Sequence, residues 1–255
     1  AWRASAAARR SAAARRRDEE RGAIAVGEFC TMPRANLLGK VRAFVRGLDG
    51  GDNCNVNVLD AGDRFVALTE SARELEFDPA TLETIGEVEH GDDLRAMLAT
   101  PHPIVDEESD VIANVYVRFA RRSEYLICER ARSSTERRVV ATLEADRPAY
   151  LHSFGMSRAH FVVIEVPLTA HPLRMRFSTR PYIQRYRWDP ERGTRVRVLR
   201  RSDGAVVAEH ATDAFFMFHV VNTFEREGAV ELDVLVYPDA SVLTDFLLSR
   251  LRSGA

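Results

Sequence analysis

Three of the seven histidines have neighbours that suggest a metal site, because each sits among apolar or aromatic residues near the start of a segment with β character. They are His102 in TPHPIVD, His152 in YLHSFG and His219 in FFMFHVV. A neutral imidazole is a common ligand for divalent metals. For each histidine taken alone, the alternative is a core side chain bonded to a backbone carbonyl. The question is therefore whether the fold brings the three together.

Strand-turn-strand patterns recur along the chain and could position these histidines. We predict strands flanking turns at 61–63, 202–204 and 226–228, and three further strands between Ala113 and Leu143. A hairpin is predicted over Tyr150 to Pro167, with Gly155 and Ser157 in its turn and His152 on its first strand. Units of about 40 to 50 residues with several strands each are typical of β-propeller blades, whose innermost strands line one axis. Histidines at equivalent places on such strands would converge.

The composition is that of a globular protein, with 45% hydrophobic residues in 255 and a formal net charge of -2. It indicates no nucleic-acid partner, and no apolar run is long enough to cross a bilayer. Cys30, Cys54 and Cys128 are widely spaced and odd in number, which favours a reducing compartment and a cytoplasmic location. There is no GxSxG, Walker or GxGxxG motif.

Two N-terminal segments each allow two interpretations. Residues 1–17 are rich in Ala, Arg and Ser and lack acids, as in an organelle transit peptide, or as in a disordered leader from a GC-rich gene. We therefore place a leader at 1–21 and the folded domain at 22–255. Asn36 to Leu48 predicts a short basic amphipathic helix, which could lie in a lipid interface or pack on the protein core.

The motifs taken together resemble one known family, the carotenoid cleavage oxygenases, which include retinal-forming enzymes and the retinoid isomerohydrolase of the visual cycle. The similar segments are DNCNVNVL, LTES, PHPIVD, YLHSFGMS, FFMFHVVNTFE and VYPDAS, spread over about Glu28 to Arg252. This resemblance implies an all-β fold, part of a seven-bladed β-propeller, truncated, with Fe(II) on its axis. It implies a dioxygenase that cleaves a conjugated double bond of a carotenoid or apocarotenoid with O2, giving carbonyl products.

Carried over residue by residue, the resemblance makes His102, His152 and His219 metal ligands. It makes Glu70 a carboxylate that accepts a hydrogen bond from the ring of a metal-bound histidine. It also places Thr69 beside the substrate cavity and Asn36 to Leu48 at a membrane surface through which a lipophilic polyene enters. Ile104 and Val220 replace histidines common in the family at positions that do not bind the metal. The fourth histidine and two further glutamates of the family would fall beyond this chain.

We therefore expect the N-terminal half of such an enzyme, inactive alone. The alternatives are an isomerohydrolase-like reaction on the same iron, or a non-catalytic propeller that binds lipophilic or protein partners.

Overall fold

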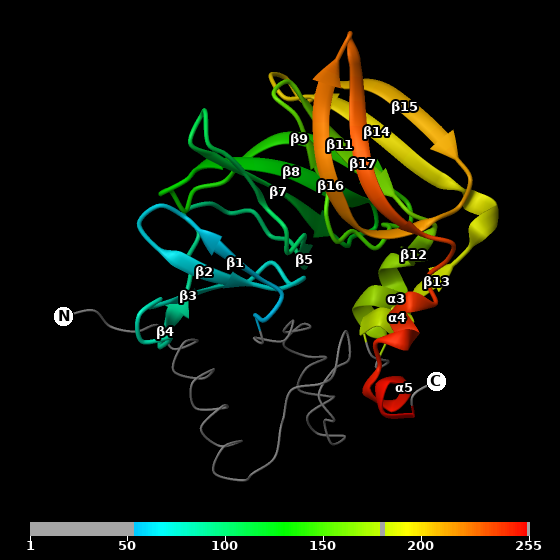
Figure 1. The fold of residues 1–255 in the computed structure, drawn as a ribbon, viewed down its shortest axis with the longest axis horizontal. Helices are drawn as coiled ribbons and strands as arrows, with labels where there is room; N and C mark the ends of the chain where they lie inside the picture. Colours follow the sequence, from blue (N-terminus) through cyan, green and yellow to red (C-terminus); the bar gives the residue numbers. More distant parts are fainter. Residues whose placement is uncertain (1–53, 179–181, 254–255) are drawn as a thin grey trace.

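The computed structural model describes residues 54–178 and 182–253, which form antiparallel β-sheets with short helices at one end (Figure 1). The predicted amphipathic helix Asn36 to Leu48 and the leader at 1–21 lie outside the described residues. The strands of the first two sheets are β1 (Asn57–Asp60), β2 (Phe65–Leu68), β3 (Glu74–Phe77), β4 (Thr84–Glu87), β5 (Leu98–Ala99), β6 (Ile104–Asp106), β7 (Val111–Arg118), β8 (Ser123–Ala131) and β9 (Arg138–Ala145). The later strands are β10 (Gly155–Met156), β11 (His160–Glu165), β12 (Leu168–Ala170), β13 (Tyr186–Trp188), β14 (Thr194–Arg200), β15 (Val206–Thr212), β16 (Phe216–Arg226) and β17 (Ala229–Tyr237).

Neighbouring strands in the sequence pair with each other, as expected for blades. One sheet has the order β1-β2-β3-β4, and the next has the order β5-β7-β8-β9 with β6 also paired to β7. A third has the order β10-β11-β14-β15, while β12-β13 and β16-β17 form two-stranded sheets. In Figure 1 the sheet of β1–β4 lies at one side, β7–β9 lie in the middle, and the sheets of β11, β14 and β15 and of β16 and β17 lie at the other side. This fold agrees with the expected all-β class.

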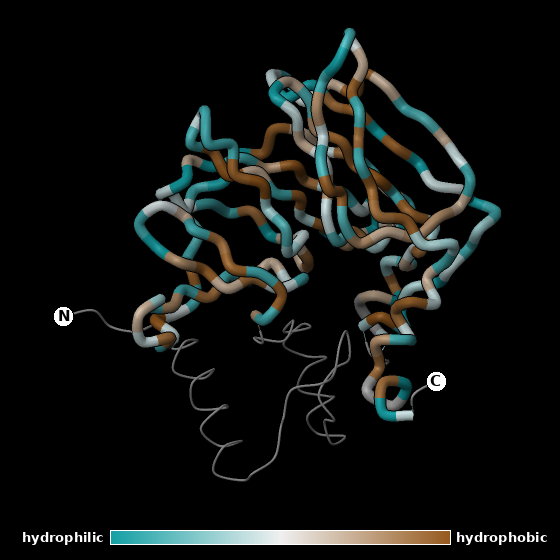
Figure 2. Tube along the Cα trace, in the orientation of Figure 1, coloured by the Kyte–Doolittle hydropathy of each residue, from teal (hydrophilic) through white to brown (hydrophobic). Residues whose placement is uncertain are grey.

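The main hydrophobic core joins the later sheets. Tyr125 and Ile127 of β8, Phe161 of β11 and Phe216 of β16 are all fully buried in it. β8 and β11 are buried on both faces, which is why their sequences read as nearly continuous apolar runs. Figure 2 shows this apolar interior as brown strands crossing the middle of the trace.

The hairpin around His152 differs from the prediction. Its strands are β10 and β11, its turn lies at 157–159, and Tyr150 to Phe154 is not a strand. Gly155 lies in β10, and glycine is favoured there because a Cβ would lie 2.6 Å from Thr223 Oγ1 on β16. The glycine thus serves a close strand contact and not the turn.

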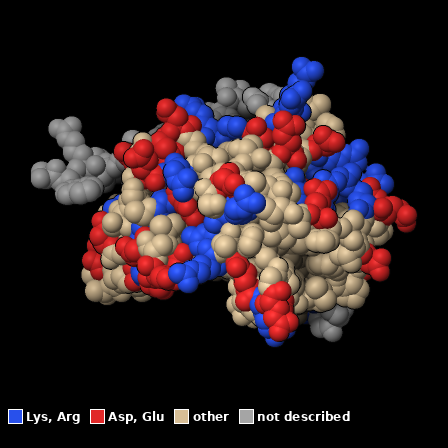
Figure 3. Space-filling model, turned by 90° about the horizontal axis from the view of Figure 1, so that it is seen from above, with Lys and Arg blue, Asp and Glu red and all other residues tan. Residues whose placement is uncertain are grey.

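The short helices lie close together in space, at the lower right of Figure 1. They are α3 (Pro172–Phe177), α4 (Val242–Asp245) and α5 (Leu248–Ser253), with 3₁₀ turns η1 (Tyr182–Arg185) and η2 (Pro190–Arg192) between β12 and β14. Among the described residues, no helix is long and apolar enough to span a bilayer. On the face seen in Figure 3, acidic and basic side chains are interspersed with uncharged ones.

Candidate metal centre

His102, His152 and His219 meet in space although 117 residues separate the first from the last. His102 Nε2 lies 3.1 Å from His152 Nε2 and 3.2 Å from His219 Nε2. The potential ligand atoms of all three lie within 4.8 Å of one another. His152 is buried, His102 is half-buried and His219 is exposed, so the group opens toward solvent on the side of His219.

Each histidine lies at or just before a strand, but they are held differently. His219 is on β16, whereas His102 precedes β6 in a loop between Pro101 and Pro103. His152 lies in a bend before β10, so the prediction that it sits on a strand is wrong. A loop residue needs fixed partners to hold its ring, and the structure supplies them.

Glu70 and Tyr150 fix the ring of His152 from behind. Glu70 Oε1 lies 2.9 Å from His152 Nδ1, and because an ionised carboxylate can only accept, Nδ1 is the donor. Tyr150 donates its hydroxyl to the same carboxylate oxygen, and its ring stacks near the imidazole. This arrangement leaves the lone pair of His152 Nε2 facing the other two histidines.

Ser153 connects the segment of His152 to the strand of His219. Its hydroxyl donates to the backbone oxygen of Phe218 at 2.7 Å and accepts from the backbone N–H of Val220 at 2.9 Å. These two residues flank His219, so one side chain sets the separation of two ligands. Sequence reasoning did not identify this role of Ser153, and its only signal there was its place next to the candidate ligand His152.

The electrostatics favour neutral imidazoles. Burial, together with the nearby His152 and His219, lowers the pKa of His102 to about 4. Burial also lowers the pKa of His219, with a smaller contribution from His152. Both rings are therefore neutral at pH 7, so no proton competes with a metal for their lone pairs.

The two separations from His102 Nε2 fit ligands that share one divalent transition-metal ion. Nitrogen ligands about 2.1 Å from a metal and at right angles to each other are about 3.0 Å apart, and about 3.4 Å apart in a tetrahedron. The observed separations of 3.1 and 3.2 Å lie between these values. Three imidazoles on one side of an ion suit Zn, Cu, Fe or Ni and leave the other side for further ligands.

The other four histidines lie outside this cluster. His160 Nδ1 lies 3.1 Å from the Glu225 carboxylate, and His171 caps α3 by accepting from the Leu173 N–H. His90 Nδ1 lies 3.0 Å from the Thr135 carbonyl oxygen, and His210 is exposed on β15. Thr69 is half-buried directly after β2, next to Glu70 in the sequence.

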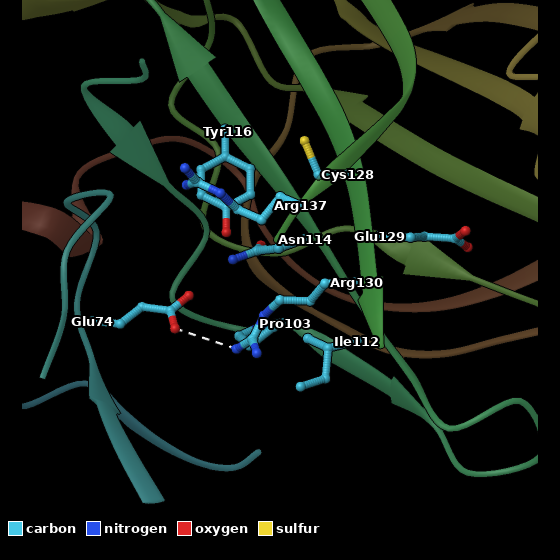
Figure 4. Close-up of a pocket in the computed structure, with 9 residues that line it drawn as sticks. All are labelled: Glu74, Pro103, Ile112, Asn114, Tyr116, Cys128, Glu129, Arg130 and Arg137. Atoms are coloured by element: carbon cyan, nitrogen blue, oxygen red, sulfur yellow. Dashed lines mark hydrogen bonds and ion pairs between the residues drawn. The ribbon is translucent and has the colours of Figure 1, made fainter. Parts of the chain in front are cut away.

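A small polar hollow lies elsewhere, where β3 faces β7 and β8 (Figure 4). Its charges are paired, with Arg130 on Glu74 at 3.3 Å and Arg137 on Asp92 at 2.7 Å. None of the three clustered histidines lines it. We regard it as a polar junction between two sheets, which the sequence analysis did not identify.

Comparison with known proteins places the chain in a family. A profile described as retinal pigment epithelial membrane protein matches residues 2–255. The chain is 30% identical to beta,beta-carotene 15,15'-dioxygenase of Mus musculus over 91% of its own length and 46% of that protein. It is 32% identical to carotenoid cleavage dioxygenase 8 homolog A, chloroplastic, of Oryza sativa subsp. japonica over 91% of its length and 44% of that protein.

Solved structures show the same fold. Cobalt-substituted Synechocystis ACO superposes with a TM-score of 0.71 at 20% identity, over 88% of this chain and 48% of that one. The chain belongs to the retinal pigment epithelial membrane protein family, that is, to the carotenoid cleavage oxygenases. It spans about half the length of the curated relatives it matches.

Proposed function

We propose that the protein is a non-haem Fe(II) dioxygenase that cleaves a conjugated double bond of a carotenoid or apocarotenoid. One double bond and one O2 would give two carbonyl groups, which balances both oxygen atoms. The observation that carries the proposal is the convergence of three imidazole Nε2 atoms in a chain of this family. Relatives named as carotene and carotenoid dioxygenases support the substrate class.

In this proposal His102, His152 and His219 would hold the iron. When bound, Fe(II) would supply the one-electron chemistry that lets O2 react with a closed-shell double bond. Glu70 and Tyr150 would keep the ring of His152 oriented, and Ser153 would hold His219 at its distance. The fourth histidine and two glutamates implied by the resemblance would come from beyond these 255 residues, so we expect little turnover from them alone.

Buried aromatic rings pack against the histidine site. The ring centroid of Phe218 lies 5.3 Å from that of His152, and Phe216 lies 4.8 Å from Phe218. Both phenylalanines are buried, as is Tyr150, which stacks near Phe216. This packing would shield that side of the histidine site from water. We place Thr69, beside Glu70, at the edge of the same region.

The test is product analysis of the full-length protein with an apocarotenoid and O2. Two carbonyl products that depend on His152 support cleavage, and His160→Ala is the matched control because that imidazole also has a carboxylate partner but lies outside the cluster. A single rearranged alcohol would instead support an isomerohydrolase. Products unchanged by His152→Ala would exclude the metal centre, and no reaction together with no bound Fe(II) would favour a non-catalytic binding protein.

We also propose peripheral membrane association through Asn36 to Leu48, on a cytoplasmic protein, as the route for lipophilic substrate. The support is the sequence pattern, an apolar stripe opposite Lys40, Arg42 and Arg46. Replacing Leu37, Val41 and Phe44 by serine should reduce co-sedimentation with liposomes of anionic lipid. Unchanged co-sedimentation would favour the alternative, a helix that packs on the protein core.

A further inference from the structure

The two-residue strand β5 lies between the segment of Glu70 and strand β7. On one side the Ala99 N–H donates to the carbonyl of Glu70 at 3.0 Å, and Leu98 forms a β-bridge with Ser71. On the other side both residues of β5 pair with β7. His102 follows β5 by three residues. The strand therefore connects the backbone of Glu70, whose carboxylate orients one candidate ligand, to the loop that carries another.

Thr100, the residue directly after β5, is held on β7 by Asn114. Asn114 donates Nδ2–H to the Thr100 carbonyl at 3.0 Å, and its Oδ1 accepts from the Thr100 hydroxyl. Oδ1 also accepts from the Val115 N–H at 2.8 Å, and the Thr100 N–H donates to the Val115 carbonyl at 2.9 Å. These bonds define the orientation of the amide, because turning it over would set its NH2 group against a backbone N–H and its oxygen against a carbonyl.

The contact between these two residues is buried. Thr100 is 1% exposed and Asn114 is 6% exposed. The N–H, the carbonyl and the hydroxyl of Thr100 are all bonded to β7. A buried polar network in which each group has a partner holds one geometry, because a displacement would leave a group unpaired in a dry environment. Thr100 and Asn114 thus form a rigid anchor two residues before His102.

We infer that Asn114 is a positioning residue of the metal centre, because it fixes the His102 loop relative to Glu70. The inference rests on the proposed metal centre. Asn114 acts through the backbone: it holds Thr100 on β7, and the neighbouring Ala99 holds the carbonyl of Glu70. The backbones of a ligand and of the carboxylate that orients another ligand are in this way both tied to one strand.

The position of His102 is the one that matters most for metal binding. Its Nε2 contributes both separations that fit one ion, 3.1 Å to His152 and 3.2 Å to His219. A shift of its loop would therefore change both distances together. Without Asn114 the loop would stay attached, because Asn57 of β1 donates to the Pro101 carbonyl at 3.0 Å, but it would no longer be held on β7 by a side chain.

The experiment is a Co²⁺ titration of the full-length protein, followed by the visible absorption of the bound ion, which reports the coordination geometry. We expect Asn114→Ala to weaken binding by about 10-fold and to change the spectrum; the effect lies at the lower end for partners of metal ligands because it is transmitted through the backbone. Ser123→Ala is the matched control, since this buried serine of β8 bonds to the backbone of Ala120 and lies outside the histidine cluster. It should lower the melting temperature and leave the Co²⁺ affinity and spectrum as in wild type.

A second pair of variants keeps the inference testable if Asn114→Ala does not fold. Thr100→Val has the shape of threonine and keeps the backbone bonds, but it lacks the hydroxyl that donates to Asn114. We expect it to change the Co²⁺ spectrum in the same direction as Asn114→Ala, with a smaller loss of affinity. Thr100→Ser retains the hydroxyl and should restore the wild-type spectrum.

The outcomes separate the inference from the proposed function. If the wild-type protein binds Co²⁺ and both Asn114→Ala and Thr100→Val bind it with unchanged affinity and spectrum, Asn114 does not position the ligand. An equal loss of affinity in Ser123→Ala would also overturn the inference, because the effect would then follow stability alone. A wild-type protein that binds no Co²⁺ refutes the metal centre itself, and this inference with it.

Discussion

Removal of the Glu70 carboxylate tests how the metal centre is built. Glu70 accepts from His152 Nδ1 at 2.9 Å, and both side chains are largely buried, so the bond is shielded from water. We expect Glu70→Ala to reduce metal affinity by about 10- to 100-fold, which corresponds to about 1.4 to 2.7 kcal/mol. Glu70→Gln keeps an acceptor but loses the charge, so its effect should lie between those of wild type and Glu70→Ala.

The chain contains a good control for this prediction. Glu225 is bonded to His160 Nδ1 at 3.1 Å, much as Glu70 is to His152, but this second pair lies outside the histidine cluster. A hydrogen bond from Ser157, together with those from Ala159 N–H and His160, lowers the pKa of Glu225 to about 2, so Glu225 is ionised at pH 7. Glu225→Gln should leave metal affinity unchanged.

The assay is a Co²⁺ or Fe²⁺ titration of wild type, Glu70→Ala, Glu70→Gln and Glu225→Gln under reducing conditions. Thermal unfolding of each variant without added metal shows how much of any loss reflects stability. Equal affinity in Glu70→Ala and wild type would refute the reasoning. So would an equal loss in Glu225→Gln, because the effect would then not depend on contact with a ligand.

Three further predictions concern stability. Phe161→Ala should cost about 3–5 kcal/mol in urea unfolding because the ring is fully buried, whereas Val139→Ala, at a position 43% exposed, should change stability by less than about 0.5 kcal/mol; equal losses would contradict the assigned core. Gly204→Ala should destabilise the protein more than Gly228→Ala. Both glycines have positive φ, which costs an alanine about 1 kcal/mol, but only at Gly204 would the new Cβ lie 2.2 Å from a backbone oxygen. Equal melting temperatures of the two variants would refute that contact. Burial acts to raise the pKa of Asp92, but hydrogen bonds from Arg137 and from Leu94 N–H outweigh it, so the pKa lies below the ordinary 3.8. The stability advantage of wild type over Asp92→Asn should accordingly be full above pH 3.8 and decline as the pH falls below it, and an advantage independent of pH in acid would contradict the ion pair.

Much of the fold could be predicted from local patterns. The strand pairs at 57–68, 194–212 and 216–237 have clear apolar alternation or β-branched runs around glycine-containing turns, and the structure contains them. The short strands β3 to β6 were not predicted, because they carry little periodicity and, unlike the equally short β1 and β2, none of them pairs across a glycine-containing turn. Gly155 was misinterpreted because a glycine required by a close strand contact looks the same in sequence as one required by a turn.

The sequence by itself was enough to recognise the family motifs and to select the three histidines that could bind one metal ion. Only the tertiary structure decided that His102 Nε2 lies 3.1 and 3.2 Å from the Nε2 atoms of His152 and His219, a separation at which ligands of one metal ion lie. The partners that hold the ligands come from distant segments: Glu70 is 82 residues from His152, and Asn57 is 44 from Pro101 in the loop of His102. The direction of an imidazole depends on such contacts between sheets, and no spacing within one segment of the chain encodes it.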